Sequence, residues 1–195
     1  MAIKTLGTGG DYATFTAAIA GIATWDRLEV ITAGTYTESA ALPAISKTVE
    51  FVNLSGGQVI IRTPLGSRIG QISGGVTVTW TGDFVHEIRK PGFGGTEYHW
   101  LISGSGSKLL TDGCTFVSDY TTGNTQVVYQ AANNSHEFRN CTMTGVYGCL
   151  VTVGSGICNT SVIDGLTIDG STKSIVHGDT PTDLFGSFDH RRIAG

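Results

Sequence analysis

Short runs of alternating apolar and polar residues, separated by glycine-containing turns, run through most of this chain of 195 residues. The clearest alternation covers residues 76–80, and similar runs occur at 28–32, 49–52 and 59–61. Successive side chains of a β-strand point to opposite faces, so a period of two predicts strands with one buried face. The pattern therefore predicts an all-β chain built from many short strands.

One segment near the N-terminus has the period of a helix instead. Phe15, Ala18, Ile19 and Ile22 lie at positions i, i+3, i+4 and i+7, which places them along one side of a short helix. Thr14 directly precedes them and belongs to the residue types that cap helix N-termini. We expect a short helix with one apolar side.

The second half of the chain contains an internal repeat. Three segments share the order acidic or amide residue, apolar residue, threonine and large apolar residue. They align on Cys114, Cys141 and Leu166, which recur at a period of roughly 26 residues, within the range of solenoid repeats. Short strands that recur at this period without helices between them indicate a solenoid of stacked coils. About seven coils of this length fit into the chain.

Stacking the repeats predicts which residues become neighbours. The expected groups are an inward column of Cys114, Cys141 and Leu166, a second column of Phe116, Met143 and Ile168, and a turn cluster of Asp112, Asn140 and Asp164. Two carboxylates on neighbouring coils are able to act as acid and base. Asp and Asn at turns more commonly bond to the backbone and to one another, so we interpret the cluster as a turn ladder.

The composition fits an all-β chain rich in turns. Charged residues make up 14% of the sequence, well below the roughly 25% of an average domain, while 28 residues are glycine. The net charge of −4 disfavours nucleic acid as a partner, because that partner selects for a basic surface.

The N-terminal residues lack the apolar core of a signal peptide, and no apolar run reaches the roughly 18 residues of a membrane span. We therefore expect a protein made in the cytoplasm, without a membrane partner. In that compartment Cys114, Cys141, Cys149 and Cys158 are expected to be buried thiols rather than a disulfide framework.

Two N-terminal segments carry a resemblance to a known family. Residues 10–15, Gly-Asp-Tyr-Ala-Thr-Phe, with Ala18-Ile19 resemble the opening of pectin methylesterases and related pectin-lyase-like proteins. Residues 30–38, Val-Ile-Thr-Ala-Gly-Thr-Tyr-Thr-Glu, resemble the first coil of the same superfamily. The resemblance implies a single-stranded, right-handed parallel β-helix with a short N-terminal capping helix. The alternative is an unrelated β-sandwich with a similar turn.

We expect one domain with three parts: a strand and cap helix in residues 1–24, β-helix coils in 25–177, and a tail in 178–195. The β pattern stops after His177, but apolar residues continue. We interpret the tail as a docking segment; its candidate residues are Leu184, Phe185, Phe188, His190, Arg191, Arg192 and Ile193. The alternative is that the tail folds back over its own last coil.

The catalytic segments of the related enzymes are absent. Pectin methylesterases carry Asp-Phe-x-Phe-Gly and Leu-Gly-Arg, and pectate lyases carry a cluster of acids for calcium. Polygalacturonases carry Asn-Thr-Asp, Asp-Asp, Gly-His-Gly and Arg-Ile-Lys. Only fragments remain here, at His177-Gly178 and Arg192-Ile193. We therefore predict no catalytic residues and no cofactor, and the hypothesis that the chain is an enzyme is left open but disfavoured.

The other chemistry-bearing residues do not form a motif. The histidines, at positions 86, 99, 136, 177 and 190, show no metal-binding spacing, so no metal site is predicted. Cys114 and Cys141 are interpreted as a buried reduced pair. Five aromatic residues fit either a sugar-stacking platform or a core stack equally well: Trp25, Trp80, Trp100, Tyr98 and Tyr120.

These observations favour a non-enzymatic structural protein of a virus particle, of the capsid decoration, cement or head-fibre type, from a bacteriophage. The expected partners are the major capsid protein or other virion subunits, with a homotrimer as one possible assembly. We expect removal of residues 184–195 to abolish particle binding without unfolding the coils. The alternatives are a tailspike-like module that binds or cleaves polysaccharide and a bacterial enzyme that has kept the fold; both rest on analogy at the level of fold.

Overall fold

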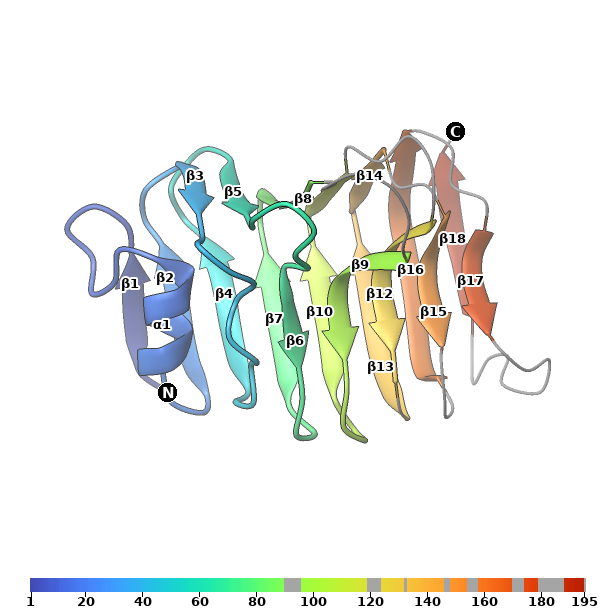
Figure 1. Cartoon of the computed structure of the whole chain (residues 1–195), viewed down its shortest axis with the longest axis horizontal. Helices are drawn as coiled ribbons and strands as arrows, with labels where there is room; N and C mark the ends of the chain where they lie inside the picture. Colours follow the sequence, from blue (N-terminus) through green and yellow to red (C-terminus); the bar gives the residue numbers. More distant parts are fainter. Residues whose placement is uncertain are drawn as a thin grey trace.

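The computed structural model describes residues 1–89, 96–118, 124–131, 133–145, 148–153, 158–169, 174–178 and 188–194. All strand pairs among them are parallel, and the chain forms a β-solenoid of about five turns with a single short helix (Figure 1). The predicted parallel solenoid is confirmed. The β-sandwich alternative is wrong, because sandwiches are built from antiparallel sheets. The right-handed winding stays a prediction.

The strands stack on three faces of the solenoid. The first face carries β1 (Ile3–Leu6), β2 (Asp26–Val30), β4 (Val49–Asn53), β7 (Thr77–Thr81), β10 (Lys108–Asp112), β13 (Asn134–Arg139), the first part of β16 (Cys158–Asp169) and β18 (Phe188–Ala194). The second face carries β3 (Gly34–Thr37), β5 (Val59–Arg62), β8 (Phe84–Ile88), β11 (Thr115–Ser118), β14 (Thr142–Thr144) and the rest of β16. The third face carries β6 (Gly70–Ile72), β9 (Thr96–Ile102), β12 (Asn124–Gln130), β15 (Gly148–Val153) and β17 (Ser174–Gly178).

The bend between the first two faces depends on a column of left-handed residues. Gly82, Gly113, Asn140 and Gly165 all have positive φ, between 50° and 101°, and each follows the strand of its coil on the first face or, in β16, the part that lies there. Glycine adopts this conformation without a steric penalty, and asparagine tolerates it better than most other residues. The pairs Asp112-Gly113, Arg139-Asn140 and Asp164-Gly165 of the repeat are thus the bends between the first two faces in their coils.

The first inward column predicted from the repeat is present, and the second is in the expected register. Thr115, Thr142 and Thr167 are register partners, so the preceding Cys114, Cys141 and Leu166 lie above one another, each about 1% exposed. Phe116, Met143 and Ile168 are register partners as well. Stacking therefore builds the continuous apolar core that a single coil lacks.

The helix closes the N-terminal end of this core. Helix α1 (Phe15–Gly21) begins where predicted, and the Thr14 hydroxyl accepts a hydrogen bond of 3.1 Å from the amide of Ala17. The predicted stripe from Phe15 to Ile22 is buried. The Phe15 ring lies 5.8 Å from Trp80, which in turn stacks on Phe51 at 3.9 Å. α1 thus covers the aromatic core. Figure 1 shows this helix at the N-terminal end of the solenoid.

The number of coils is lower than the repeat suggested. About five turns replace the predicted seven, since the segment 1–24 contributes one strand and the helix rather than a full coil. The coils also differ in length: the register partners Thr77 and Lys108 are farther apart in the sequence than the register partners Ser135 and Thr160. The period visible in the second half therefore does not hold throughout.

The tail contains a strand that the sequence did not reveal. Phe188–Ala194 forms β18 and pairs in parallel with β16, which places Ile193 in register with Leu166. The prediction that strand structure ends after His177 was therefore wrong for this segment. Its charged residues hide any alternation of apolar and polar positions. β18 adds a strand to the chain's own last coil. Leu184 and Phe185 lie outside the described residues, and docking by the tail stays a prediction.

Candidate functional site

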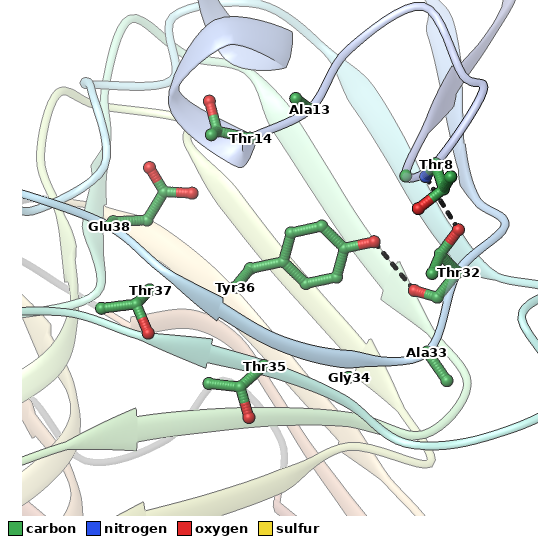
Figure 2. Close-up of a pocket in the computed structure, with 11 residues that line it drawn as sticks. Thr8, Ala13, Thr14, Thr32, Ala33, Gly34, Thr35, Tyr36, Thr37 and Glu38 are labelled. Carbon is green, nitrogen blue, oxygen red and sulfur yellow. Dashed lines mark hydrogen bonds between the residues drawn. The ribbon is translucent and has the colours of Figure 1, made fainter.

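A cleft of about 380 Å³ lies at the N-terminal end of the solenoid, between the β1–α1 loop and β3 (Figure 2). Its size falls in the range of roughly 300–1,000 Å³ that is usual for ligand pockets. Its lining comprises Gly7, Thr8, Ala13, Thr14, Thr32, Ala33, Gly34, Thr35, Tyr36, Thr37 and Glu38. Threonine is the commonest residue in this lining, and the lining has no lysine or arginine.

The loop between β1 and α1 forms one wall of the cleft. The amide of Gly7 donates to the carbonyl of Tyr12 at 2.9 Å, and the amide of Thr8 donates to the Thr32 hydroxyl, also at 2.9 Å. Gly7 has φ +129°, and a Cβ there would lie 2.5 Å from the Thr32 Oγ1 atom. Only glycine allows this approach, so the loop is fixed at its contact with the first coil.

Tyr36 extends between the two walls (Figure 2). Its hydroxyl donates to the carbonyl oxygen of Thr32 at 2.8 Å, and the edge of its ring packs on Phe15 with 5.3 Å between ring centroids. Partial burial raises the pKa of Tyr36 above its ordinary value. The ring is therefore a fixed, uncharged part of the cleft rather than a proton donor near neutral pH.

Glu38 closes the end of the cleft nearest the helix. One carboxylate oxygen accepts the amide of Phe15 at 2.9 Å and the other accepts the Thr16 hydroxyl at 2.6 Å. The side chain is buried, and these bonds tie the end of β3 to the first turn of α1. Because both carboxylate oxygens accept hydrogen bonds from α1, the role of Glu38 is to attach the cap helix to the first coil.

The predicted turn cluster is present and bonds from coil to coil. The Asn140 side-chain amide donates to the Asp112 carboxylate at 2.8 Å, and the Asn140 backbone amide donates to the Asp164 carbonyl at 2.7 Å. Asp112, Arg139 and Asp164 share one register row, and Asn140 takes the left-handed position beside it. Arg139 therefore lies between the two carboxylates, and its guanidinium is 3.9 Å from Asp164. These contacts are those of a turn ladder.

Beside this row, Glu137 forms one ion pair across the coils and one within its own strand. Lys108 lies 2.6 Å and Arg139 lies 3.1 Å from the Glu137 carboxylate. Partial burial would raise the pKa of Glu137, but the hydrogen bonds from Lys108 and Arg139 outweigh it and hold that pKa below its ordinary value. Glu137 is thus an ionised bridge between β10 and β13.

Three histidines lie fully inside the solenoid. Burial and the nearby His99 lower the pKa of His86 to about 3, and burial lowers the pKa of His136 to about 4 despite the charge of Glu137. Burial also lowers the pKa of His99, whose ring nitrogens lie 3.0–3.1 Å from two backbone carbonyl oxygens. All three side chains are neutral near pH 7.

The cysteine prediction is confirmed for two of the four residues. Cys114 and Cys141 are free, buried thiols, and burial raises the pKa of both. A thiol whose pKa is raised carries little thiolate near neutral pH, so neither is a nucleophile. The side chains of Cys149 and Cys158 lie outside the described part of the structure.

The five aromatic candidates separate into two environments. Trp80 and Trp100 are fully buried and belong to the core stack, where the Trp100 indole donates to His86 at 3.0 Å. Trp25 is 66% exposed, whereas Tyr98 is partly buried on the third face. The Tyr98 ring stacks on Tyr129 at 5.4 Å, and its hydroxyl accepts from Arg68 at 3.0 Å. Tyr120 lies outside the described residues.

Sequence reasoning treated residues 30–38 as evidence of fold only and missed the cleft. The available signal was the run Thr-Ala-Gly-Thr-Tyr-Thr-Glu, in which hydroxyl groups surround one aromatic ring. That run did not predict which edge of the strand lacks a partner strand. Among the described residues, no group of three or more His, Cys, Asp or Glu side chains is placed to bind a metal ion. The described helix is also too short to cross a membrane.

Comparisons with protein-family models, with curated proteins and with solved structures gave no match.

Proposed function

We propose that this chain is a non-enzymatic structural protein of a bacteriophage particle, of the capsid decoration, cement or head-fibre type. The observation that carries the proposal is that some of the polar side chains described above bond one coil to the next. Asn140 joins Asp112 at 2.8 Å, and Glu137 joins Lys108 at 2.6 Å. Such bonds reinforce a rod along its length, which is the mechanical requirement of a particle component.

We also infer a relation to the pectin-lyase-like superfamily. It is supported by the cap helix that follows the Gly-Asp-Tyr segment at residues 10–12 and by the parallel coils behind it. Within that superfamily the chain would be a member that uses the fold as a scaffold, with the major capsid protein or another virion subunit as its partner.

Quantitative mass spectrometry of purified particles of the encoding virus tests this proposal. Hundreds of copies per particle would establish a decoration role. A few trimers per particle would favour the tailspike-like alternative, and assays of polysaccharide binding and cleavage would follow. Absence from the particle would overturn the proposal and return attention to Asp112 and Asp164 as acids.

The docking tail requires a more careful variant than truncation. Removing residues 184–195 also removes β18 and exposes the edge of β16, so lost binding would have two explanations. Arg191→Ala with Arg192→Ala keeps the main-chain bonds of the strand and removes only two charges. We expect particle binding to fall about tenfold with an unchanged β circular dichroism spectrum. Lys4→Ala on β1, at the other end of the first face, is the control for loss of a positive charge. Unchanged binding by the double variant would contradict a docking role for these arginines.

A further inference from the structure

The cleft at the N-terminal end coincides with a vacant strand position. β3 is the last strand of the second face, because β5 pairs with one of its edges and no described strand pairs with the other. On the first face β1 adds a further strand beyond β2. After Leu6 the chain leaves this layer, since a turn between Gly7 and Gly10 (3.0 Å) directs it toward α1.

The hydrogen-bond pattern between β3 and β5 determines which backbone groups of β3 point toward the vacant strand position. The amide of Gly34 donates to Gln58 and that of Glu38 to Arg62, both at 2.9 Å. In a parallel ladder alternate residues make both bonds to the same neighbour, so Tyr36 belongs to this set. The amides and carbonyls of Thr35 and Thr37 therefore point to the free edge.

Among the described strands, only β5 pairs with β3, so the outward amides of Thr35 and Thr37 have no strand partner, and both residues are exposed. Two N–H and two C=O groups at strand spacing form a template for another extended backbone. The cleft confines this template between the β1–α1 loop and β3, with Tyr36 between them (Figure 2).

We propose that this cleft is a strand-acceptor site that binds a short extended segment of another protein chain beside β3. β3 has four residues, or about 13 Å at 3.3 Å per residue, so the bound segment is about four residues long. The lining contains threonine hydroxyls and no basic side chain, which fits an uncharged peptide and disfavours an anionic ligand. Affinity comes from the main chain, and the inference holds whether or not the protein belongs to a virus particle.

Amide hydrogen exchange followed by NMR tests the proposal on the full chain. The probe is the blocked peptide acetyl-Thr-Val-Thr-Val-Thr-amide, which repeats the alternation of β7. At saturating peptide we expect the amides of Thr35 and Thr37 to exchange at least about tenfold more slowly. The amides of Gly34, Tyr36 and Glu38 are bonded to β5 in both states and should not change.

Paired variants separate main-chain from side-chain recognition. Thr37→Pro removes an outward N–H but none of the bonds to β5, a position where an edge strand tolerates proline. It should weaken peptide binding about tenfold at unchanged melting temperature. Thr37→Val keeps the backbone and removes only the hydroxyl, so it should bind the peptide as the parent chain does, which preserves the test if the proline variant fails to fold.

Three results would overturn the proposal. The first is no protection of Thr35 and Thr37 at millimolar peptide, since main-chain recognition does not depend on a special sequence. The second is loss of binding in Thr37→Val, which assigns recognition to the hydroxyl. The third is protection of the same amides by neutral methyl glycosides but not by the peptide, which would make the cleft a saccharide site.

Discussion

The first coils and the middle coils have equally buried interiors of different chemistry. Near the cap the interior is aromatic: the rings of Phe51 and Trp80 stack at 3.9 Å, and Phe15 of α1 lies against them. Farther along, the interior also holds His99, His136 and other side chains that form hydrogen bonds.

This comparison shows that two equally buried interiors can differ in how their stability depends on pH. Aromatic burial contributes a free energy that does not depend on pH. A buried histidine is stable only in its neutral form, because charging it inside the core carries a large desolvation cost. We therefore expect the first coils to set the overall stability and the buried histidines to set its pH dependence.

The largest single effect should come from the aromatic interior. Trp80→Ala removes a fully buried ring that contacts Phe51, Phe15 and Trp100, and it should lower the free energy of unfolding by about 4 kcal/mol. Urea unfolding monitored by circular dichroism measures this. Trp25→Ala removes a tryptophan that is 66% exposed and should cost much less. An equal loss of unfolding free energy in the two variants would show that the aromatic stack near the cap contributes no more than an exposed tryptophan.

Acid should destabilise the coils that hold buried histidines, and these include the coil of Trp80, since the ring of His86 lies 5.0 Å from that of Trp80. Above about pH 6.5 the histidines are neutral in both states. Below that pH the unfolded chain binds protons, whereas folded His136 does so only near pH 4 and folded His86 only near pH 3. The unfolding free energy should therefore fall by about 1.4 kcal/mol per pH unit for each histidine, or about 2 kcal/mol each by pH 5.

The measurement is a set of urea titrations between pH 7.5 and pH 5. His136→Gln keeps a polar side chain that does not titrate, so its stability should fall less steeply with pH than that of the parent. A slope identical to that of the parent would mean that His136 does not contribute to the acid sensitivity.

The cap should contribute a smaller amount to the first coils. Thr14→Ala removes the hydroxyl that accepts the amide of Ala17 at 3.1 Å and should cost about 1 kcal/mol. Thermal melting detects a change of this size. Thr79→Ala on the first face is the control for loss of a surface hydroxyl, and an equal shift in both variants would argue against a specific capping role.

The smallest effect should come from the surface pair that joins β5 to β8. The Arg62 guanidinium lies 2.8 Å from the Glu87 carboxylate, which raises the pKa of Arg62 above its ordinary value. Both side chains are partly exposed to solvent, so a double-mutant cycle with Arg62→Met and Glu87→Gln should give below about 1 kcal/mol. The coupling should shrink further in high salt, and a salt-independent value would contradict a solvent-screened pair.

The sequence predicted the repeat and the cap well because both depend on local order. The spacing of Cys114, Cys141 and Leu166 gave their column, and the stripe beginning at Phe15 gave the helix. The turn cluster was predicted in outline. The alignment on Cys114, Cys141 and Leu166 also gave the correct register, because it places Arg139 in the row of Asp112 and Asp164; the predicted cluster took Asn140, one position later.

The strand Phe188–Ala194 and the cleft were not predictable in the same way. β18 forms against the edge of β16, and its own residues show no clear alternation. The cleft depends on the path of the chain after Leu6, where a turn leaves one strand position above β3 empty. Both features depend on strands that are distant in the sequence.

The sequence by itself therefore determined the parallel stack, the first inward column and the capped end, since periodicity acts through neighbouring residues. Only the tertiary structure decided that the histidines are buried and neutral and that Thr35 and Thr37 face an open edge. Hydrogen-bond direction and desolvation depend on which strands meet across the fold. Those partners are set by coil length and chain path, which no local pattern encodes.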